Sequence, residues 1–247
     1  MRVVITGASG GIGTATAAEL RSRGASVIGL DLVPGDDVIE CDVRDQASVD
    51  AAIAEAIDRL GGLDALVNNA GIGAPQSAGT APDERALAVI DINLVGPWRV
   101  TAAALPALRA SRGRVINVAS GLAHLALPYG TAYCMSKRGL TAYSDSLRLE
   151  HGDAITVTTV YPGYMRTAIH DEPNAAGVTL EGKVPVEKVE DAARTIARAI
   201  YGSPARDLAT TRHGAIGYAV LRHIPRRLLD RILRRRIERA DLTLRAS

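Results

Sequence analysis

The chain has 247 residues, of which 47% are hydrophobic and 23% are charged, and this is the ordinary composition of a soluble globular protein. The net charge of +2 is unevenly distributed, because nine arginines face three acidic residues from residue 222 onward and the first 221 residues are therefore mildly acidic. No apolar run approaches the ~20 residues of a membrane span and no signal-peptide pattern follows Met1, so we expect a cytoplasmic protein.

The two cysteines, Cys41 and Cys134, lack the spacing of metal ligands and are too few for a disulfide framework. We therefore expect both thiols to be reduced and packed, and we predict no metal site.

The first predicted unit is a strand, a glycine-rich loop and a helix. A β-branched run over residues 2–6 leads into Gly7-Ala8-Ser9-Gly10-Gly11-Ile12-Gly13, and an alanine-rich helical stretch continues to about Arg23. Glycines let a diphosphate approach the backbone amides at a helix N-terminus, where the helix dipole favours negative charge. This context predicts a dinucleotide site, although such a loop could also be only a turn.

A second predicted strand, over residues 26–30, ends in Asp31. In a dinucleotide-binding fold, an acid ~20 residues after the glycine loop accepts hydrogen bonds from the adenosine ribose hydroxyls and repels a 2′-phosphate. The nearby loop positions offer no positive charge to such a phosphate; they are Ala8, Ser9, Leu32 and Val33. The sequence therefore predicts NAD rather than NADP, and the alternative is that Asp31 is a solvated loop residue.

Only residues 32–36 separate this strand from the next one, near residues 38–41. Neighbouring parallel strands usually need a crossover of about a dozen residues, commonly a helix. Either the crossover helix is missing or the predicted strand ends are wrong by a few residues. Asp45 then caps a predicted helix over residues 46–60, which Gly61-Gly62 ends.

A strand over residues 65–67 leads into Asn68-Asn69-Ala70-Gly71. These residues could form a simple turn. In an open parallel sheet, however, the carboxyl ends of the strands are also where ligands bind.

A long helix is predicted over residues 80–109, with Thr80 as its N-cap and Pro82 in its first turn. Inside it, Asn93 is a poor helix former and Pro97 interrupts the backbone hydrogen bonds. A freed carbonyl beside a buried asparagine invites a bound water molecule.

Ser120 follows a predicted strand over residues 114–118, and Tyr133 and Lys137 lie in a predicted helix over residues 131–149. Four residues apart, the phenol and the ammonium group share one helix face. A phenol with a pKa of ~10 exchanges protons poorly near neutral pH, whereas a neighbouring ammonium favours the phenolate. The pair predicts proton-transfer chemistry, although a tyrosine and a lysine can also fall at this spacing by chance.

The rest of the chain continues the alternation of strand and helix. A strand over residues 155–161, the turn Pro162-Gly163, a mobile loop over 168–185, a helix over 186–200 and a strand over 206–211 are predicted in that order. No repeat or low-complexity linker divides the chain. We therefore expect one α/β domain over residues 1–211, followed by an extension over residues 212–247.

Several motifs now stand together in order: Thr6-Gly7-Ala8-Ser9-Gly10-Gly11-Ile12-Gly13, Asn68-Asn69-Ala70-Gly71, Asn93, Ser120, Tyr133-x-x-x-Lys137, and Pro162-Gly163 with Thr167. In order and spacing they resemble the short-chain dehydrogenase/reductase family, over residues 1 to about 211. The resemblance implies a doubly wound parallel sheet, the Rossmann fold, of about seven strands. It also implies a homodimer or homotetramer.

The resemblance further implies roles for individual residues. Tyr133 would exchange the proton with the alcohol or ketone oxygen, and Lys137 would lower the pKa of Tyr133 and bind the nicotinamide ribose. Ser120 would hold the substrate oxygen, and Asn93 would keep a water molecule that relays protons from Lys137 to solvent. The implied cofactor-binding residues are Gly7, Gly11, Ile12 and Gly13 at the diphosphate, Asp31 at the adenine ribose, Asp42 and Val43 at the adenine, Asn69 beside the nicotinamide, Thr167 at its carboxamide, and also Ser9, Ala70, Gly71, Tyr133, Lys137, Pro162 and Gly163.

The chain departs from the family pattern in the short link after Asp31 and in its basic end. Beyond Pro225, apolar residues recur at helical spacing between arginines, at positions 228, 229, 232, 233, 237 and 240. This predicts an amphipathic basic helix that docks on the body or a neighbouring subunit, or lies on an anionic membrane surface. We expect no nucleic-acid binding, because the segment lacks interleaved aromatic residues and any known reading motif.

Five residues are expected near the substrate, namely His124, Leu125, Leu127, Tyr164 and Met165, and they predict a largely apolar pocket. The predicted function is an NAD-dependent oxidoreductase that interconverts a hydrophobic secondary alcohol and its ketone, with Tyr133 as general acid and base. The alternative is a non-enzymatic dinucleotide sensor or scaffold that uses the basic tail to bind a partner.

Overall fold

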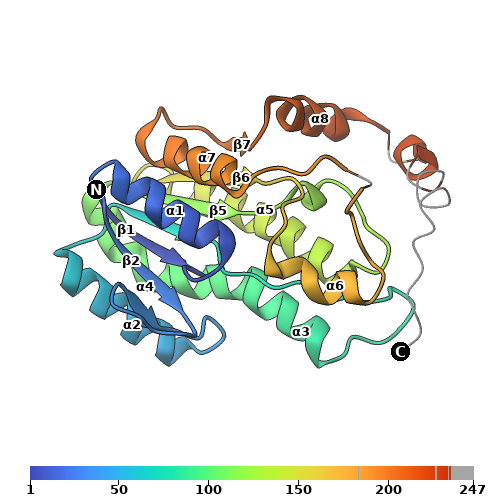
Figure 1. The fold of residues 1–247 in the computed structure, drawn as a ribbon. Helices are drawn as coiled ribbons and strands as arrows, with labels where there is room; N and C mark the ends of the chain where they lie inside the picture. The colour runs from blue at the N-terminus through green and yellow to red at the C-terminus, as the bar shows by residue number, and fades with distance from the viewer. Residues whose placement is uncertain (183, 226, 233, 235–247) are drawn as a thin grey trace.

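The computed structural model describes residues 1–182, 184–225, 227–232 and 234. Within these residues, seven parallel strands form one sheet in the order β3-β2-β1-β4-β5-β6-β7 (Figure 1). The strands are β1 (Arg2–Thr6), β2 (Ser26–Asp31), β3 (Val38–Glu40), β4 (Ala65–Asn68), β5 (Arg114–Val118), β6 (Thr156–Tyr161) and β7 (Asp207–Ala209). The predicted doubly wound parallel sheet is confirmed.

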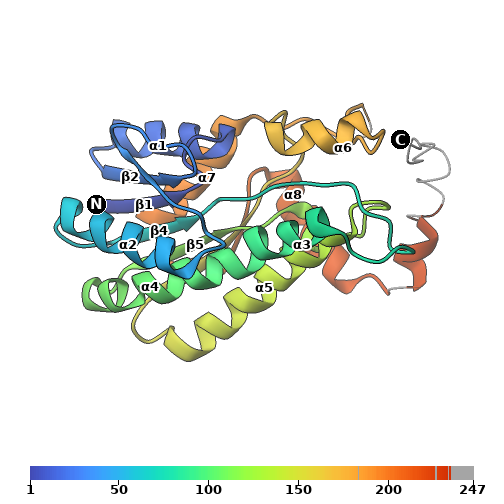
Figure 2. The same ribbon diagram turned by 90° about the horizontal axis from the view of Figure 1, so that it is seen from below.

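Helices cover both faces of the sheet. Helices α1 and α7 lie on one face, and α2, α4 and α5 lie on the other, as the two views show (Figures 1 and 2). The described helices are α1 (Gly11–Ser22), α2 (Gln46–Leu60), α3 (Glu84–Ile90), α4 (Gly96–Ser111), α5 (Thr131–His151), α6 (Asp171–Ala175), α7 (Val189–Tyr201) and α8 (Arg212–His223), with a π-helical segment at Asp91–Val95 and 3-10 turns at Gly121–Ala123 and Ala168–His170. None of them, in the part of the chain described, is long and apolar enough to cross a bilayer.

Successive side chains of β1 point to opposite faces of the sheet and so belong to two different layers of the core. Val3 and Ile5 belong to the apolar cluster that includes residues of α1 and α7, whereas Val4 belongs to the cluster that includes residues of α2 and α4. All three side chains are fully buried. Because burial of a Val or Ile side chain stabilises the fold by ~1.5–3 kcal/mol, a shift of one residue in register would be strongly unfavourable.

Strands β2 and β3 are joined without a crossover helix. Residues 32–37, all of them described, form a short link in which Gly35 and Val38 exchange backbone hydrogen bonds of 2.9 and 3.1 Å. The amide of Gly29 also donates to Asp37 O at 2.7 Å. The helix is therefore missing, and the predicted strand ends needed a correction of only one residue.

The predicted helix over residues 80–109 is in fact two helices. The carboxylate of Asp83 accepts a hydrogen bond from Ala86 N at 2.8 Å, so α3 begins at residue 84 and the predicted cap at Thr80 is wrong. The π-helical segment Asp91–Val95 separates α3 from α4. Pro97 has no N–H to donate to the preceding turn, and the wider π turn accommodates that gap in the hydrogen bonding.

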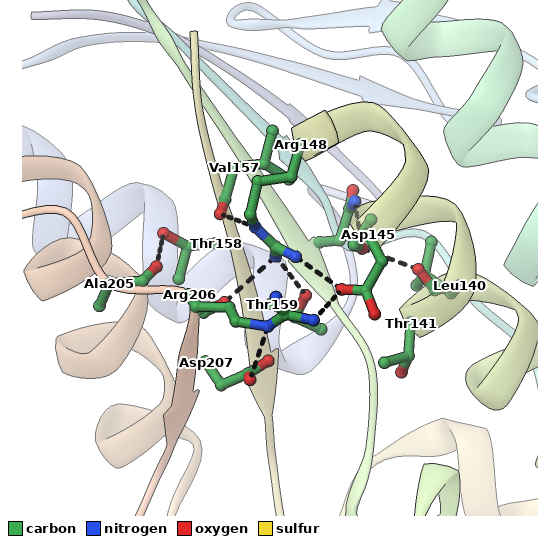
Figure 3. Close-up of polar contacts among 12 residues, drawn as sticks. Leu140, Thr141, Asp145, Arg148, Val157, Thr158, Thr159, Ala205, Arg206 and Asp207 are labelled. Carbon is green, nitrogen blue, oxygen red and sulfur yellow. Dashed lines mark hydrogen bonds and ion pairs between the residues drawn. The ribbon is translucent and has the colours of Figure 1, made fainter. Parts of the chain in front are cut away.

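A group of arginine contacts fastens the outer strands to α5 (Figure 3). The guanidinium of Arg148 donates to Val157 O at 3.1 Å and to Arg206 O at 3.3 Å. The carboxylate of Asp145 accepts from Arg148 at 2.6 Å and from Arg206 at 2.8 Å. These contacts hold β6 and the segment before β7 against the same helix.

The structure corrects the prediction after β6. The expected loop over residues 168–185 contains the 3-10 turn Ala168–His170 and the short helix α6. Helix α7 begins at Val189 rather than at residue 186, and β7 is shorter than predicted. The helical period was missed because α6 has only five residues, too few for a pattern to emerge.

Part of the predicted basic helix after Pro225 is described. Residues 227–232 and 234 are helical, with Leu229 buried and Leu228 and Ile232 exposed. The other apolar positions of the predicted helix, Leu233, Ile237 and Ala240, lie outside the described residues, as do five of the eight arginines after Pro225. The amphipathic extension thus stays a prediction beyond residue 234.

Candidate active site

The glycine loop between β1 and α1 is folded tightly against itself. Gly7 has a φ of +65°, which favours glycine over any L side chain. A methyl group added at Gly13 would lie 2.1 Å from Gly7 O, a distance that real contacts do not reach. These two glycines bring the loop backbone and the first turn of α1 together.

The Asn68-Asn69-Ala70-Gly71 segment after β4 braces this loop. The hydroxyl of Thr6 accepts hydrogen bonds from Asn69 N and Ala70 N, each at 3.0 Å. In return, the side-chain amide of Asn69 donates to Thr6 O at 3.1 Å and to Gly7 O at 3.0 Å. The predicted position of Asn69 beside the nicotinamide is untested, but its structural role in holding the glycine loop is clear.

A cleft of about 420 Å³, hereafter the main cleft, opens at the carboxyl ends of β1, β2 and β4. Most of the predicted cofactor residues line it: Gly7, Ser9, Gly11, Ile12, Asp31, Asp42, Val43, Asn69, Ala70, Gly71 and Thr167. The volume is typical of a small-molecule site. Backbone amides at a helix N-terminus and an acid at the end of β2 are the groups that a dinucleotide requires, so these residues fit such a cofactor.

Five predicted cofactor residues do not line the main cleft: Gly13, Tyr133, Lys137, Pro162 and Gly163. Gly13 packs beneath the loop, against Gly7 O. The amide of Gly163 donates to the carboxylate of Glu187 at 2.9 Å. Pro162 precedes it, and its carbonyl accepts from Gly121 N at 3.0 Å. The turn thus contacts the Ser120 segment and the segment just before α7.

The acidic and basic groups that line the main cleft at or after the ends of β2 and β3 are already hydrogen-bonded. Asp31 accepts from Ser9 N at 2.9 Å and from Leu32 N at 2.8 Å. Arg44 also lines the cleft, and its guanidinium donates to Asp42 at 2.6 to 3.1 Å. This pairing holds the pKa of Asp42 below its usual value.

Arg44 is not among the residues predicted from the sequence, because it lies outside the loop positions next to the glycine loop and to Asp31. The signal was present, since Arg44 directly follows the predicted adenine contacts Asp42 and Val43. Other lining residues that were missed are apolar or glycine, such as Ile72, Ile92 and Ile169.

Lys137, Tyr133 and Ser120 come together behind the main cleft. Lys137 is only 3% exposed, and its Nζ donates to Val118 O at 3.0 Å and lies 5.6 Å from the centroid of the Tyr133 ring. The Ser120 side chain is a hydrogen-bond partner of the Tyr133 phenol. A methyl group added at Gly71, on the cleft wall, would lie 3.5 Å from Lys137 Nζ. The phenol, hydroxyl and ammonium therefore meet beside the cleft.

Burial is the largest influence on the pKa values of Tyr133 and Lys137. It raises the pKa of Tyr133 to about 12, and the hydrogen bond from Ser120 opposes that rise. Burial also lowers the pKa of Lys137 to about 8. The expected lowering of the Tyr133 pKa by Lys137 is therefore not found in this structure, because burial has the largest effect on the pKa of each group. The Tyr133 phenol is therefore neutral at neutral pH.

Asn93 lies in the π-helical segment and is fully buried. Its side-chain oxygen accepts from Ile72 N at 2.9 Å, and its side-chain nitrogen donates to Ile72 O at 2.9 Å and to Ser136 Oγ at 3.3 Å. The amide thus clamps the backbone next to Gly71 and ties it to α5. The predicted role of Asn93 with a water molecule remains a prediction.

A second, smaller hollow of about 40 Å³, hereafter the apolar pocket, adjoins Tyr133. Its lining is mostly hydrophobic: Gly73, Ala74, Leu122, Leu127, Tyr129, Gly130, Tyr133, Ile169, His170, Pro173, Val178 and Leu180. Ile169 lines both the main cleft and the apolar pocket. The two hollows are thus neighbours through Ile169, and Tyr133 lines the apolar pocket.

Among the five residues expected near the substrate, only Leu127 lines the apolar pocket. The ring of His124 packs instead on Tyr161 and Tyr218, with centroid distances of 4.7 and 5.2 Å. Tyr164 is buried and stacks on His170 at 4.7 Å, one layer behind the pocket wall. The missed lining residues Val178 and Leu180 come from the predicted loop, where short apolar stretches offered the only signal.

Comparison with known proteins agrees with this geometry. The model of the short chain dehydrogenase family matches residues 1–177. Human retinol dehydrogenase 16 is 38% identical over 188 residues, an alignment that covers 68% of this chain but only 57% of that protein. The chain thus spans less than two-thirds of the length of this curated relative.

Solved structures with the same fold carry both kinds of nicotinamide cofactor. A short chain dehydrogenase from Burkholderia cenocepacia J2315, in complex with NADP, aligns with a TM-score of 0.79 and 27% identity, covering 94% of this chain and 96% of that one. The 3-ketoacyl-(acyl-carrier-protein) reductase from Brucella melitensis, complexed with NADH, aligns with a TM-score of 0.73 and 26% identity, covering 85% and 97%. This chain belongs to the short-chain dehydrogenase/reductase family of oxidoreductases.

Proposed function

We propose that this protein is an NAD-dependent oxidoreductase that interconverts a hydrophobic secondary alcohol and its ketone. The observation that carries the proposal is the meeting of Tyr133, Ser120 and Lys137 where the main cleft adjoins the apolar pocket. An oxygen atom at Tyr133 would have a phenol and a hydroxyl within reach, and the carbon chain would lie among apolar side chains. That combination suits a carbonyl or carbinol carbon with hydrophobic substituents.

The protein's own groups handle the proton and the charge on the substrate oxygen. Tyr133 donates its proton to that oxygen during ketone reduction and removes it during alcohol oxidation, and Ser120 orients the oxygen by hydrogen bonding. Lys137 supplies the nearby positive charge that favours the phenolate when the proton has left. Bound in the main cleft, NAD would supply the hydride acceptor, and its reduced form the hydride donor.

The same proposal includes a path for the proton to solvent. We assign a water molecule beside Asn93 to this path, leading from Lys137. The supporting observation is the π-helical segment around Asn93, where the backbone departs from the regular i to i−4 pattern.

NAD is proposed over NADP because Asp31 stands at the end of β2 and lines the main cleft. A carboxylate there would repel the 2′-phosphate of NADP. Arg44 is the basic side chain nearest in sequence that lines the cleft, and its guanidinium is already paired with Asp42. The cofactors of the two solved relatives differ, so this preference rests on Asp31.

The assembly and the surroundings are also proposed. Trp98 on α4 and Leu149 on α5 are 60% and 88% exposed, and such apolar surface supports a homodimer or homotetramer. We propose residues 1–211 as the catalytic domain, in the cytoplasm, with the extension over 212–247 in contact with a neighbouring surface, an anionic membrane among the candidates. The exposed Arg227, Arg231 and Arg234 support that contact.

The test is NAD reduction with a panel of hydrophobic secondary alcohols. We expect Tyr133→Phe to lower kcat by about 10²- to 10⁴-fold, the usual contribution of a general acid–base group. Tyr201→Phe, an exposed tyrosine on α7, is the matched control and should keep the parent rate. Cofactor binding without turnover of any alcohol or ketone would instead favour a dinucleotide sensor or scaffold.

A further inference from the structure

Helix α8, which lies beyond the residues matched by the family model, packs against the turn that carries Ser120. The contact is made by the Tyr218 ring on Gly121. A methyl group added at Gly121 would lie 2.3 Å from Tyr218 Oη and 2.9 Å from its Cζ, so the phenol ring lies directly against the backbone of this glycine. Figure 1 shows α8 beside β6 and β7.

The turn itself is short and depends on its neighbours. Ser120 Oγ accepts a hydrogen bond from Leu122 N at 3.2 Å, and Ser120 O accepts from Ala123 N at 3.0 Å. Gly121 lies between these bonds, and its own amide donates to Pro162 O at 3.0 Å. Any displacement of Gly121 would therefore move the Ser120 hydroxyl.

Tyr218 is held in place by aromatic neighbours. Its ring lies 5.2 Å from His124 and 6.0 Å from Tyr161, and it joins a small apolar cluster with Ala119 and Ala123. Burial raises the pKa of the Tyr218 phenol to about 12, so the side chain stays neutral and acts by packing.

The segment that leads into α8 is fastened as well. Glu187, which lies two residues before α7, accepts hydrogen bonds from Thr210 and Thr211, which follow β7, and from Gly163 N. The carboxylate thus joins the Pro162-Gly163 turn to the base of α8. Both turns at this edge of the sheet are tied to the same C-terminal segment.

We propose that Tyr218 is a positioning residue for Ser120, so that the C-terminal segment beyond β7 sets the geometry of the active site. This inference rests on the proposed function of Ser120. Tyr218 presses on Gly121 from the side of α8 and keeps the Ser120 hydroxyl directed at the Tyr133 phenol. Displacement of a catalytic group by about 1 Å can lower a rate about 10²-fold, so a packing contact of this kind has a measurable effect.

The first experiment replaces the ring. Tyr218→Ala is expected to lower kcat by about 10- to 100-fold while the KM for NAD stays close to the parent value, because the main cleft is not lined by α8. Tyr218→Phe keeps the packing surface and should retain most of the parent kcat. Ile216→Ala, on the same helix and 60% exposed, is the matched control and should leave kcat unchanged.

The second experiment tests the contact itself with a double-mutant cycle. Gly121→Ala should lower kcat and the melting temperature, because its new methyl group meets the Tyr218 ring. In the Tyr218→Ala background that obstruction is gone, so Gly121→Ala should then have a much smaller effect on both quantities. Equal effects of Gly121→Ala in the two backgrounds would overturn the proposal, as would a parent-like kcat for Tyr218→Ala.

The outcomes also separate this inference from the proposed function. If the parent protein turns over no alcohol or ketone, the proposed function fails, and the positioning role fails with it. If the parent is active and the cycle shows coupling in melting temperature but none in kcat, the proposed function stands. Tyr218 is then only a packing residue, and the positioning role is overturned.

Discussion

The ammonium group of Lys137 is buried in the protein interior and donates a hydrogen bond to Val118 O. Its pKa is lowered from 10.5 to about 8, so the folded protein holds this proton less tightly than the unfolded chain does. Below pH ~8 Lys137 is protonated in both the folded and the unfolded protein, and the folded protein bears the full cost of burying its charge. Between pH ~8 and ~10.5 the folded protein loses the proton first, so its stability rises with pH. Above that window the penalty is gone.

We therefore predict that Lys137→Met stabilises the protein at pH 7 while abolishing turnover. Each pKa unit by which burial lowers the Lys137 pKa corresponds to ~1.4 kcal/mol of stability that the variant regains, and the loss of the donor to Val118 O offsets part of it. The expected gain in unfolding free energy is therefore ~1–3 kcal/mol. Chemical denaturation at pH 7 and near pH 10.5 would measure it, and the difference between variant and parent should shrink at the higher pH. A variant that is less stable than the parent at pH 7 would contradict the assignment of a burial penalty to Lys137.

Asp31 decides the proposed cofactor preference. Asp31→Ala should lower the ratio of kcat/KM for NAD over NADP by about tenfold or more, because the repulsion of a 2′-phosphate is removed. Asp36→Ala changes an exposed acid on the link that follows and serves as the control. If the parent already binds NADP as tightly as NAD, the role of Asp31 at the ribose is wrong.

At the scale of elements, the arginine contacts of Figure 3 decide how firmly the outer strands are held. The Arg148 side chain is 19% exposed and bonds to two backbone carbonyls and to Asp145. Arg148→Met should lower the unfolding free energy by ~1–3 kcal/mol, since buried acceptors lose a charged donor. Arg194, in an exposed pair with Asp191, offers the contrast.

Denaturant unfolding of both variants would make that comparison. Arg194→Met should change the unfolding free energy by less than ~1 kcal/mol, because exposed ion pairs are weak. Equal losses for the two variants would mean that Arg148 is no more than a surface charge.

At the scale of the whole molecule, truncation can test what the basic C-terminal segment contributes. A chain that ends at Ile224 retains α8 and the Tyr218 contact, and we expect it to keep the parent kcat. We expect the full chain to co-sediment with anionic vesicles more than this truncated chain does, because the removed segment carries eight arginines against three acidic residues. Equal pelleting of the two proteins would remove the membrane proposal and leave docking on the body or a partner subunit.

Much of the fold could be predicted from local signals. A β-branched run predicts strand β1. Glycines at positions where a larger residue would clash predict the loop and the start of α1, as the contact of Gly13 with Gly7 O illustrates. Helix α2 has its predicted cap, since Asp45 accepts from Ala47 N at 2.9 Å, and Gly61 ends the helix with a φ of +67°. These features depend on a few adjacent residues, and so the sequence displays them directly.

The sequence-based predictions that were wrong share a physical cause. Asp83 and Thr80 are both good N-cap residues, and only the packing of α3 decided between them. The pKa of Tyr133 could not be derived from its spacing to Lys137, because the burial of both groups depends on the assembled sheet and loops. His124 follows Ser120 closely, yet aromatic neighbours from β6 and α8 hold it away from the apolar pocket.

By itself the sequence determined the order of the elements, the glycine loop, the acid at the end of β2 and the pairing of Tyr133 with Lys137 on one helix face. These properties arise from backbone sterics and helical periodicity, which act over a few residues. Only the tertiary structure decided that the main cleft and the apolar pocket share Ile169, that Arg44 is paired with Asp42, and that Tyr218 lies on Gly121. Such contacts join residues that are distant in the chain, and they exist only when packing has excluded water and fixed the distances between elements.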